Sequence, residues 1–194
     1  MISNGGAYTA FFDANVLFSP LVTDLILELA VANVYRPRWS QKVHDEWIAA
    51  VLQTRPHLAL SALQRRCALM DEAFPDALVS ELTSWHWPQL PDPDDAHVIA
   101  SAFCARADVI VTNNKRHFPS ALMASLGMVV QSADEFLHHA LDISDHTSRQ
   151  AVQNLLQRRK RPAPWHAEML ALALELESRS MLQTAKTIRG LFPQ

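Results

Sequence analysis

The chain has 194 residues, 49% of them hydrophobic, which is enough to bury a core as one domain, with or without an appendage. Its formal net charge is -3, so no global basic field draws it to nucleic acid. Only four residues are glycine, which excludes the dinucleotide fingerprint and the P-loop, because both need several glycines within a few residues. If this protein handles phosphate, it must therefore use side chains or metal ions.

The cysteines and the first residues of the chain bear on its compartment. Cys67 and Cys104 have no CxxC motif and no Cys/His spacing, so we expect neither a disulfide framework nor a structural zinc site. The chain begins MISNGGAY, which lacks the basic and apolar regions of a signal peptide, and no uncharged apolar run approaches the roughly 18 residues of a membrane span. We expect a soluble, cytoplasmic protein with no membrane partner.

The predicted elements alternate between strands and helices. In the first half they are a strand at 9–12, a helix at 24–32 capped by Thr23, a strand at 34–36 closed by Pro37, a helix from Ser40 to about 53 and a helix at about 58–74. A Trp- and Pro-rich loop at 84–93 precedes a helix at 93–106, a strand at 108–112, a short helix after Pro119, a strand at 128–131 and a helix opened by a Ser132/Glu135 capping box. This alternation predicts an α/β fold with a parallel sheet covered on both faces.

The character of the chain changes after about Leu141. No strand-like segment follows, and two or three helices are expected from 147 to the end, with a break at Pro162 and Pro164. We therefore predict an α/β domain over residues 1–141 and a helical C-terminal extension over residues 142–194.

Asp13 directly follows the first predicted strand. Ligands in open parallel sheets bind at the carboxyl ends of strands, which favours a functional role. Alternatively, Asp13 starts a turn with Asn15 as its local hydrogen-bonding partner. A carboxylate directly behind Phe11 and Phe12 is partly desolvated, however, and requires a compensating cation or donor.

A second group of acids opens the helix at 93–106. Asp92 reads as an N-cap and Pro93 as the first helical residue, with acids facing the positive end of the helix dipole. That reading does not account for Asp95, which begins the apolar stripe formed by Val98, Ile99, Ala102 and Phe103. Asp94 is rotated about a hundred degrees away from it.

Two further polar positions have weaker signals. Glu46 borders the apolar stripe of the helix opened by Ser40, where an acid is often only a snorkelling boundary residue. Thr112, Asn113 and Asn114 end the strand at 108–112, at the same sheet edge as the end of the first strand, although Asn is also common in turns.

These positions share one geometry, because two strand ends and two helix faces converge at one rim of a parallel sheet. Bringing three carboxylates within about 4 Å of one another costs on the order of several kcal/mol per pair at an effective dielectric near 20, unless cations intervene. A hard divalent ion resolves that conflict. Oxygen ligands favour Mg²⁺ or Mn²⁺ over zinc.

In these same segments the chain resembles PIN-domain ribonucleases, in particular the VapC-type toxins of bacterial toxin-antitoxin systems. The matching pieces are FFDANVLFSP, the spacing of Ser40 and Glu46, DPDDAHVIASA and VIVTNNKRHFP, within residues 9–141. The resemblance implies a three-layer α/β/α fold, a metal-dependent endoribonuclease activity and a cognate antitoxin partner. The helical tail resembles an extension of some longer members.

The resemblance also carries site residues onto this chain. Asp13, Glu46 and Asp95 match the three acidic metal ligands of the family, with Asp94 as an auxiliary candidate. Asn114 stands where many members have a fourth aspartate, which removes one negative charge and puts a strictly two-metal mechanism in doubt. We take Asp13, Glu46, Asp95 and Asn114 as the candidate catalytic residues.

The expected reaction is endonucleolytic RNA cleavage. Mg²⁺ or Mn²⁺ held by Asp13 and Asp95 would activate water and stabilise charge on the phosphate, while Glu46 orients or deprotonates that water. No Ser/His/Asp arrangement is required for such a reaction. The expected partners are an RNA substrate and an antitoxin, with a second copy of the chain as a further candidate.

RNA must be held locally, since the chain has no global positive charge. Thr112, Lys115 and Arg116 flank Asn114, and a basic run includes Arg158 and Arg159. Phosphate contact is one interpretation of these residues. A solvated helix end is the more common reason for such a basic run. We expect His117 to be a loop residue that forms hydrogen bonds rather than a metal ligand.

Two other functions fit parts of the sequence. The fold could bind metal or RNA without catalysis, as a regulatory or partner-binding module. The motif FFDAN also superficially resembles the start of a haloacid dehalogenase-type phosphatase, in which Asp13 would be the nucleophile. That family expects a second aspartate two residues later, where this chain has Asn15.

Overall fold

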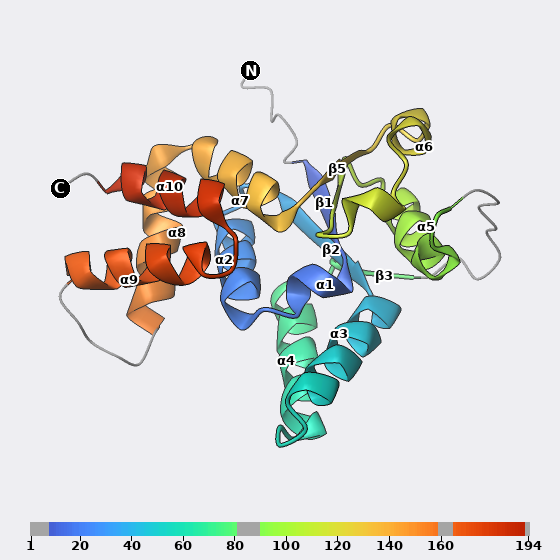
Figure 1. Ribbon diagram of the computed structural model, residues 1–194, viewed down its shortest axis with the longest axis horizontal. Coiled ribbons are helices and arrows are strands. Elements are labelled where there is room, and N and C mark those ends of the chain that lie inside the picture. Colours follow the sequence, from blue (N-terminus) through green and yellow to red (C-terminus); the bar gives the residue numbers. More distant parts are fainter. Residues whose placement is uncertain (1–7, 81–89, 159–164, 193–194) are drawn as a thin grey trace.

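The computed structural model describes residues 8–80, 90–158 and 165–192. Within them, five parallel strands form one sheet in the order β3-β2-β1-β4-β5 (Figure 1). The strands are β1 (Thr9–Phe12), β2 (Arg36–Ser40), β3 (Leu78–Val79), β4 (Val109–Val111) and β5 (Val129–Gln131). The parallel sheet predicted from the alternation of strands and helices is therefore confirmed.

Helices cover the sheet and give the expected three-layer α/β/α arrangement, with α2 and α5 on opposite sides of it (Figure 1). The helices of this part of the chain are α1 (Ala14–Leu17), α2 (Pro20–Val31), α3 (Gln41–Thr54), α4 (Leu60–Ala73), α5 (Ala96–Cys104), α6 (Ser120–Ser125) and α7 (Ala133–Asp142). Two short 3₁₀ helices, η1 (Pro93–Asp95) and η2 (Lys115–His117), lie on either side of β4 in the sequence.

The central strand is β1, whose register pairs Phe11 with Arg38 of β2 and with Ile110 of β4. Phe11 and Phe12 have no exposed surface, because β1 has a strand on each side and helices on both faces. Such a position accounts for a continuous apolar run without alternation. The run ends at Asp13, which brings a carboxylate to the edge of the core.

The second strand lies later in the chain than expected, since β2 runs from Arg36 to Ser40 and contains Pro37. Proline was expected to close this strand because it has no N–H to donate. Here Arg36 N donates to Tyr8 O on the β1 side, while Trp39 N donates to Ala77 O on the β3 side. The backbone nitrogen of Pro37 therefore points toward the β3 side. Strand β3 is short and does not extend to this level, so no backbone donor is needed there.

Two further expectations for this region were wrong. Thr23 is not an N-cap, because α2 already begins at Pro20. The Thr23 hydroxyl instead donates back to the carbonyls of Leu17, at the end of α1, and of Ser19, the N-cap of α2. Strand β3 was not expected, because two residues are too few to form a recognisable pattern. Much of the Trp- and Pro-rich loop, residues 84–89, lies outside the described residues.

The caps that the sequence predicts at three other helices are confirmed. Ser40 Oγ accepts from Val43 N (3.3 Å) at the start of α3. Ser132 and Glu135 form the capping box of α7, and Asp92 caps η1. These side chains fix where α3, η1 and α7 leave the sheet, and two of those helical segments carry candidate site residues.

The C-terminal helices are α8 (Asp145–Arg158), α9 (Trp165–Glu177) and α10 (Leu182–Leu191), and they cluster beside α2 and α7 (Figure 1). Asp134 of α7 accepts hydrogen bonds from Gln183 N (3.0 Å) and Thr184 N (2.8 Å) at the start of α10. One hydrophobic cluster includes residues of both the sheet region and these helices. The extension is therefore joined to the sheet region by buried packing.

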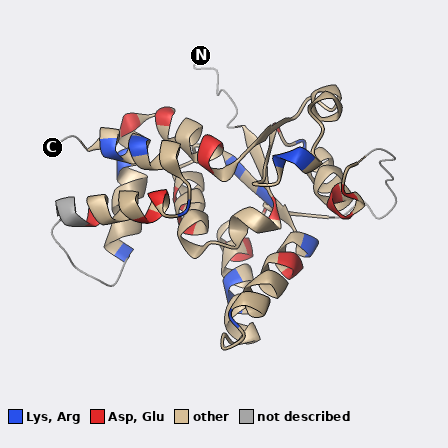
Figure 2. Cartoon of the chain, in the orientation of Figure 1, with Lys and Arg blue, Asp and Glu red and all other residues tan. Residues whose placement is uncertain are grey.

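Charges are mixed over the molecule. In the view of Figure 2, basic and acidic segments are interspersed over both the sheet region and the C-terminal helices. Cys67 and Cys104 are free, as expected. Among the described helices, none combines the length and apolar character that crossing a bilayer requires.

Candidate active site

The acids singled out in the sequence surround one cavity of about 400 Å³ at the carboxyl edge of the sheet. Its walls come from the end of β1, from α1 and α3, from η1 and from the segment after β4. The lining residues include Asp13, Glu46, Asp94, Asp95 and Asn114, together with Asn15 and the apolar side chains of Phe18 and Trp47. The tertiary structure therefore brings together residues that are up to 101 positions apart in the chain.

Asp13 is the most constrained of these acids and is only 4% exposed. Its Oδ1 accepts from Ala14 N (2.6 Å), so that Asp13 is the N-cap of α1. Its Oδ2 accepts from Asn15 Nδ2 (2.5 Å) and from the Thr112 hydroxyl (2.7 Å). Both interpretations of the sequence hold at this position, since Asp13 starts a turn with Asn15 and also lines the cavity.

Burial raises the pKa of the Asp13 carboxyl above its ordinary value. The hydrogen bond from Thr112 opposes that shift, while the negative charges of Asp95 and Glu46 add to it. Asp95 and Glu46 are thus each close enough to Asp13 to repel its ionised carboxylate. A cation bound among these acids would attract the ionised carboxylate of Asp13 and so lower its pKa.

Thr112, expected as a substrate-binding residue, is fully buried. Its hydroxyl donates to Asp13 and accepts from Asn114 N (3.1 Å), and Asn15 Oδ1 accepts from Asn113 N (2.9 Å). These bonds tie the end of β4 to the end of β1. Thr112 is therefore available to hold Asp13 in place, but it has no surface to offer a substrate.

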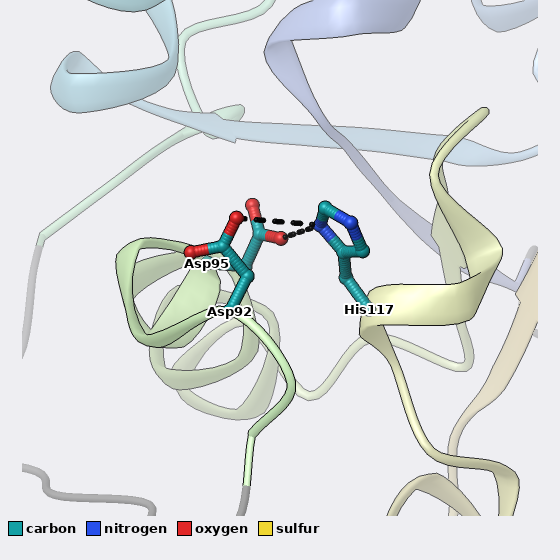
Figure 3. A group of neighbouring side chains, drawn as sticks. All are labelled: Asp92, Asp95 and His117. Atoms are coloured by element: carbon teal, nitrogen blue, oxygen red, sulfur yellow. Dashed lines mark hydrogen bonds and ion pairs between the residues drawn. The ribbon is translucent and has the colours of Figure 1, made fainter.

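Glu46 and Asp95 each have a histidine as a direct neighbour. Nε2 of His97 lies 2.8 Å from Oε1 of Glu46, and Nδ1 of His117 lies 2.7 Å from Oδ2 of Asp95. Asp92 is also close, with Oδ2 at 3.6 Å from the same nitrogen, and Figure 3 shows the imidazole facing both carboxylates. The sequence reasoning missed His97 altogether, although its position two residues after Asp95 was a possible signal.

His117 was expected to form hydrogen bonds in its loop, and the structure confirms this. Asp92, Asp95 and His117 have three potential ligand atoms within 4.8 Å of one another, as a metal site would require. However, Arg116 Nε donates to Nε2 of the same ring (3.2 Å), which makes Nε2 an acceptor and places the proton on Nδ1. In this tautomer Nδ1 donates to Asp95, so its lone pair is not available to a metal ion.

The donors around the cavity fit a hard divalent cation. Oε2 of Glu46 and Oδ1 of Asp95 have no hydrogen-bond donor among the described residues, and the charges of both acids act on buried Asp13. Asp94 and Asn114 are exposed and line the same cavity, adding a carboxylate and a neutral amide. Such oxygen-rich sets suit Mg²⁺ or Mn²⁺.

The cations proposed for RNA binding have different surroundings. Lys115 Nζ pairs with both oxygens of Glu135 (2.7 and 2.8 Å), which neutralises it locally. Arg158 pairs with Glu28 on α2 and does not line the acidic cavity. Arg159 lies outside the described residues. Of these cations, Arg116 is the one linked to the acids, through its hydrogen bond to the ring next to Asp95.

A cation that the sequence reasoning did not single out lies against Phe18, a residue of the cavity wall. The guanidinium carbon of Arg55 is 5.9 Å from the ring centroid of Phe18, which lines the cavity. This distance allows a cation–π contact. No sequence signal marks Arg55, because it follows the end of α3 and meets Phe18 only through the packing of α1 against α3.

Comparisons with known proteins assign the region that contains these residues to a family. A family described as "PIN domain" matches residues 9–116, which is more than half of the chain and includes all four candidate catalytic residues. The chain is similar to "Putative ribonuclease VapC50" of Mycobacterium tuberculosis, with 31% identity over 99 residues that make up 51% of this chain and 56% of that protein. No solved structure matched significantly. The chain belongs to the PIN domain family.

Proposed function

We propose that the protein is a metal-dependent endoribonuclease that cleaves RNA phosphodiester bonds, and that it is the toxin of a bacterial toxin-antitoxin pair. The observation that carries the proposal is the cavity where Asp13, Glu46 and Asp95 converge from three separate elements at the carboxyl edge of a parallel sheet. The ribonuclease named in the matched relative supports the same chemistry. The resemblance to VapC-type toxins extends the proposal to an antitoxin partner.

Asp13 and Asp95 would hold a Mg²⁺ or Mn²⁺ ion, with Asp94 in an auxiliary position. When bound, the ion would supply positive charge that makes water more acidic and stabilises charge on the phosphate. Glu46 would orient or deprotonate the attacking water through the oxygen that His97 does not contact. Asn114 adds no negative charge, so the proposal requires one ion and leaves a second without a full set of acids.

The phosphatase alternative has little support from the cavity. It requires a second acid two residues after the nucleophile, which would exchange a proton with the leaving group. Asn15 stands there, and its Nδ2 donates to Asp13 Oδ2. The amide is thus used to hold the carboxylate, and no proton transfer is available from it.

The decisive experiment is RNA cleavage by rigorously purified protein, with structured and unstructured RNAs, in EDTA and with added Mg²⁺ or Mn²⁺. We expect cleavage only with the metal, and we expect Asp13→Asn to abolish it while the fold persists. Asp145→Asn, on α8, is the matched control and should retain wild-type activity. Metal-dependent cleavage that survives in Asp13→Asn would overturn the assignment.

The same experiment distinguishes a nuclease from a non-catalytic module. A regulatory protein would bind Mn²⁺ or RNA and release no shortened RNA under any condition. Co-purification with a small protein encoded beside this chain, and loss of cleavage on its addition, would support the antitoxin. Cleavage that is unaffected by that neighbour would remove the toxin part of the proposal and leave the nuclease part intact.

A further inference from the structure

Two histidines, one on each side of the cavity, face two different acids. His97 is in the first turn of α5 and reaches Glu46 on α3, while His117 closes η2 and reaches Asp95 at the start of α5. Both rings are largely enclosed, with side-chain exposures of 11% and 18%. The two contacts use different ring nitrogens. Nε2 of His97 lies next to Glu46, whereas Nδ1 of His117 lies next to Asp95, as Figure 3 shows.

The proton on His117 is assigned by its neighbours on both sides. Arg116 Nε can only donate, so Nε2 of His117 must accept that bond and carries no hydrogen. The hydrogen is therefore on Nδ1, which donates to Oδ2 of Asp95 at 2.7 Å. Arg116, His117 and Asp95 form a chain of donors that ends on the carboxylate.

The proton on His97 is assigned by burial. Its Nδ1 is inaccessible to solvent and has no hydrogen-bond partner among the described residues. A hydrogen on that atom would be a buried, unpaired donor, which proteins rarely tolerate. The hydrogen is therefore on Nε2, the ring nitrogen that lies 2.8 Å from Oε1 of Glu46.

We infer that His97 and His117 are positioning residues, each of which holds one carboxylate of the cavity by donating from a defined ring nitrogen. Each donation occupies one oxygen, which leaves Oδ1 of Asp95 for a cation and Oε2 of Glu46 for the cation or the water bound to it. Groups that orient ligand carboxylates in this way contribute about 10- to 100-fold to metal affinity. The inference rests on the proposed function only in taking these acids as the metal-binding ones.

The use of different nitrogens allows a crossed substitution test. A Gln side chain places its amide nitrogen near the position of a histidine Nε2, and an Asn side chain places it near Nδ1. His97→Gln and His117→Asn should therefore preserve the donor, whereas His97→Asn and His117→Gln should lose it. All four substitutions are neutral amides, and at each position the two variants differ by one methylene, so general effects of polarity and charge cancel.

The measurement is the Mn²⁺ dissociation constant of the full, metal-free chain, obtained from the electron paramagnetic resonance of free Mn²⁺. We expect the donor-preserving pair to stay within about threefold of the wild type and the other pair to weaken by about 10- to 100-fold. Equal affinity for Asn and Gln variants at both positions would overturn the inference. RNA cleavage measured in parallel separates the positioning role from the nuclease activity. If the donor-preserving variants bind Mn²⁺ well, the other two bind it weakly and no RNA is cleaved, only the nuclease proposal is refuted.

A measurement on the unsubstituted protein makes the test independent of whether each variant folds. Long-range ¹H–¹⁵N correlation spectra report which ring nitrogen of each histidine carries the proton. The expected result is Nε2–H for His97 and Nδ1–H for His117 in the metal-free chain. The opposite tautomer at either residue would refute its positioning role, since the nitrogen facing the carboxylate would then have nothing to donate.

Discussion

The hydroxyl of Thr112 donates a hydrogen bond of 2.7 Å to Oδ2 of Asp13 across the ends of two adjacent parallel strands. The residues are 99 positions apart in the chain, and the bond is completely buried. It lowers the pKa of Asp13 against the larger effect of burial. One neutral side chain thereby favours the ionised form of the deepest acid of the cavity, although burial still leaves its pKa raised.

Replacing Thr112 by Val keeps the shape of the side chain and removes this donor. We expect the pKa of Asp13 to rise further, so that the pH at which Mn²⁺ is half-bound moves upward. The buried acceptor and the amide of Asn114 also lose their partner, which should cost about 1–3 kcal/mol of stability. Thr112→Ser retains the hydroxyl and serves as the control. A Val variant with an unchanged pH profile of Mn²⁺ binding would contradict the role given to this bond.

The raised pKa of Asp13 predicts the pH dependence of stability without metal. The folded protein holds a proton on Asp13 at pH values where the unfolded chain, with its ordinary pKa of about 3.9, has lost it. The stability of the metal-free protein should therefore fall as the pH rises from about 3.9 through the folded pKa, and remain lowered above it.

Urea unfolding in EDTA at several pH values, with Asp13→Asn in parallel, measures this effect. As the pH rises in EDTA, the free energy of unfolding of the wild type should fall relative to that of Asp13→Asn. Saturating Mg²⁺ should oppose that change by stabilising the wild type. Parallel pH curves for the two proteins in EDTA would show that Asp13 titrates alike in the folded and unfolded states.

Arg55 is expected to contact the RNA backbone, because its guanidinium lies over Phe18, which lines the acidic cavity. Arg55→Gln should weaken binding of a single-stranded RNA and reduce the slope of log affinity against log salt by about 0.7. The control is Arg179→Gln, because Arg179 lies just after α9 and pairs with Glu175 of that helix. An unchanged salt slope in Arg55→Gln, measured by fluorescence anisotropy, would rule out the phosphate contact.

Arg158 is expected to act on stability, because its partner Glu28 is only 2% exposed. Arg158→Ala leaves that carboxylate buried without its cation and should lower the free energy of unfolding by about 1–3 kcal/mol. The double variant with Glu28→Gln should recover part of the loss. RNA affinity measured on the same proteins should stay unchanged. Weaker RNA binding with undiminished stability would favour the phosphate contact considered for this residue from the sequence.

Asp134 should determine how firmly α10 is held, since its carboxylate accepts from the first free amides of that helix. Asp134→Ala removes this cap and should cost about 1–2 kcal/mol. Hydrogen exchange should accelerate in α10, and Asp134→Asn, which keeps one acceptor, should show a smaller change. Faster exchange in α8, α9 and α10 without a change in α7 would indicate that residues 142–194 unfold separately, as the predicted boundary at 141/142 implies. Matching changes in α7 and α10 would instead indicate one cooperative unit.

Local rules were sufficient for much of the fold. The caps at Ser40, Asp92 and Ser132 depend on residues within three positions of one another, and the buried run of β1 is visible as a run. Elements whose identity depends on distant partners were harder. The segment around Pro37 is a strand because the neighbouring strand does not need its missing donor. The helix that contains Thr23 has a different reason, since it begins at Pro20, a residue favoured at the first helical position.

The sequence by itself determined the candidate acids. A carboxylate that follows an apolar strand or lies on an apolar helix face is partly removed from water in the folded chain, and this cost is visible from the neighbouring residues alone. Only the tertiary structure decided what holds them. Thr112 for Asp13, His97 for Glu46 and His117 for Asp95 are pairs whose members come from different elements. A hydrogen bond depends on distances of a few tenths of an ångström and on the choice of ring nitrogen. No pattern along the chain encodes those quantities until the sheet has brought its strand ends together.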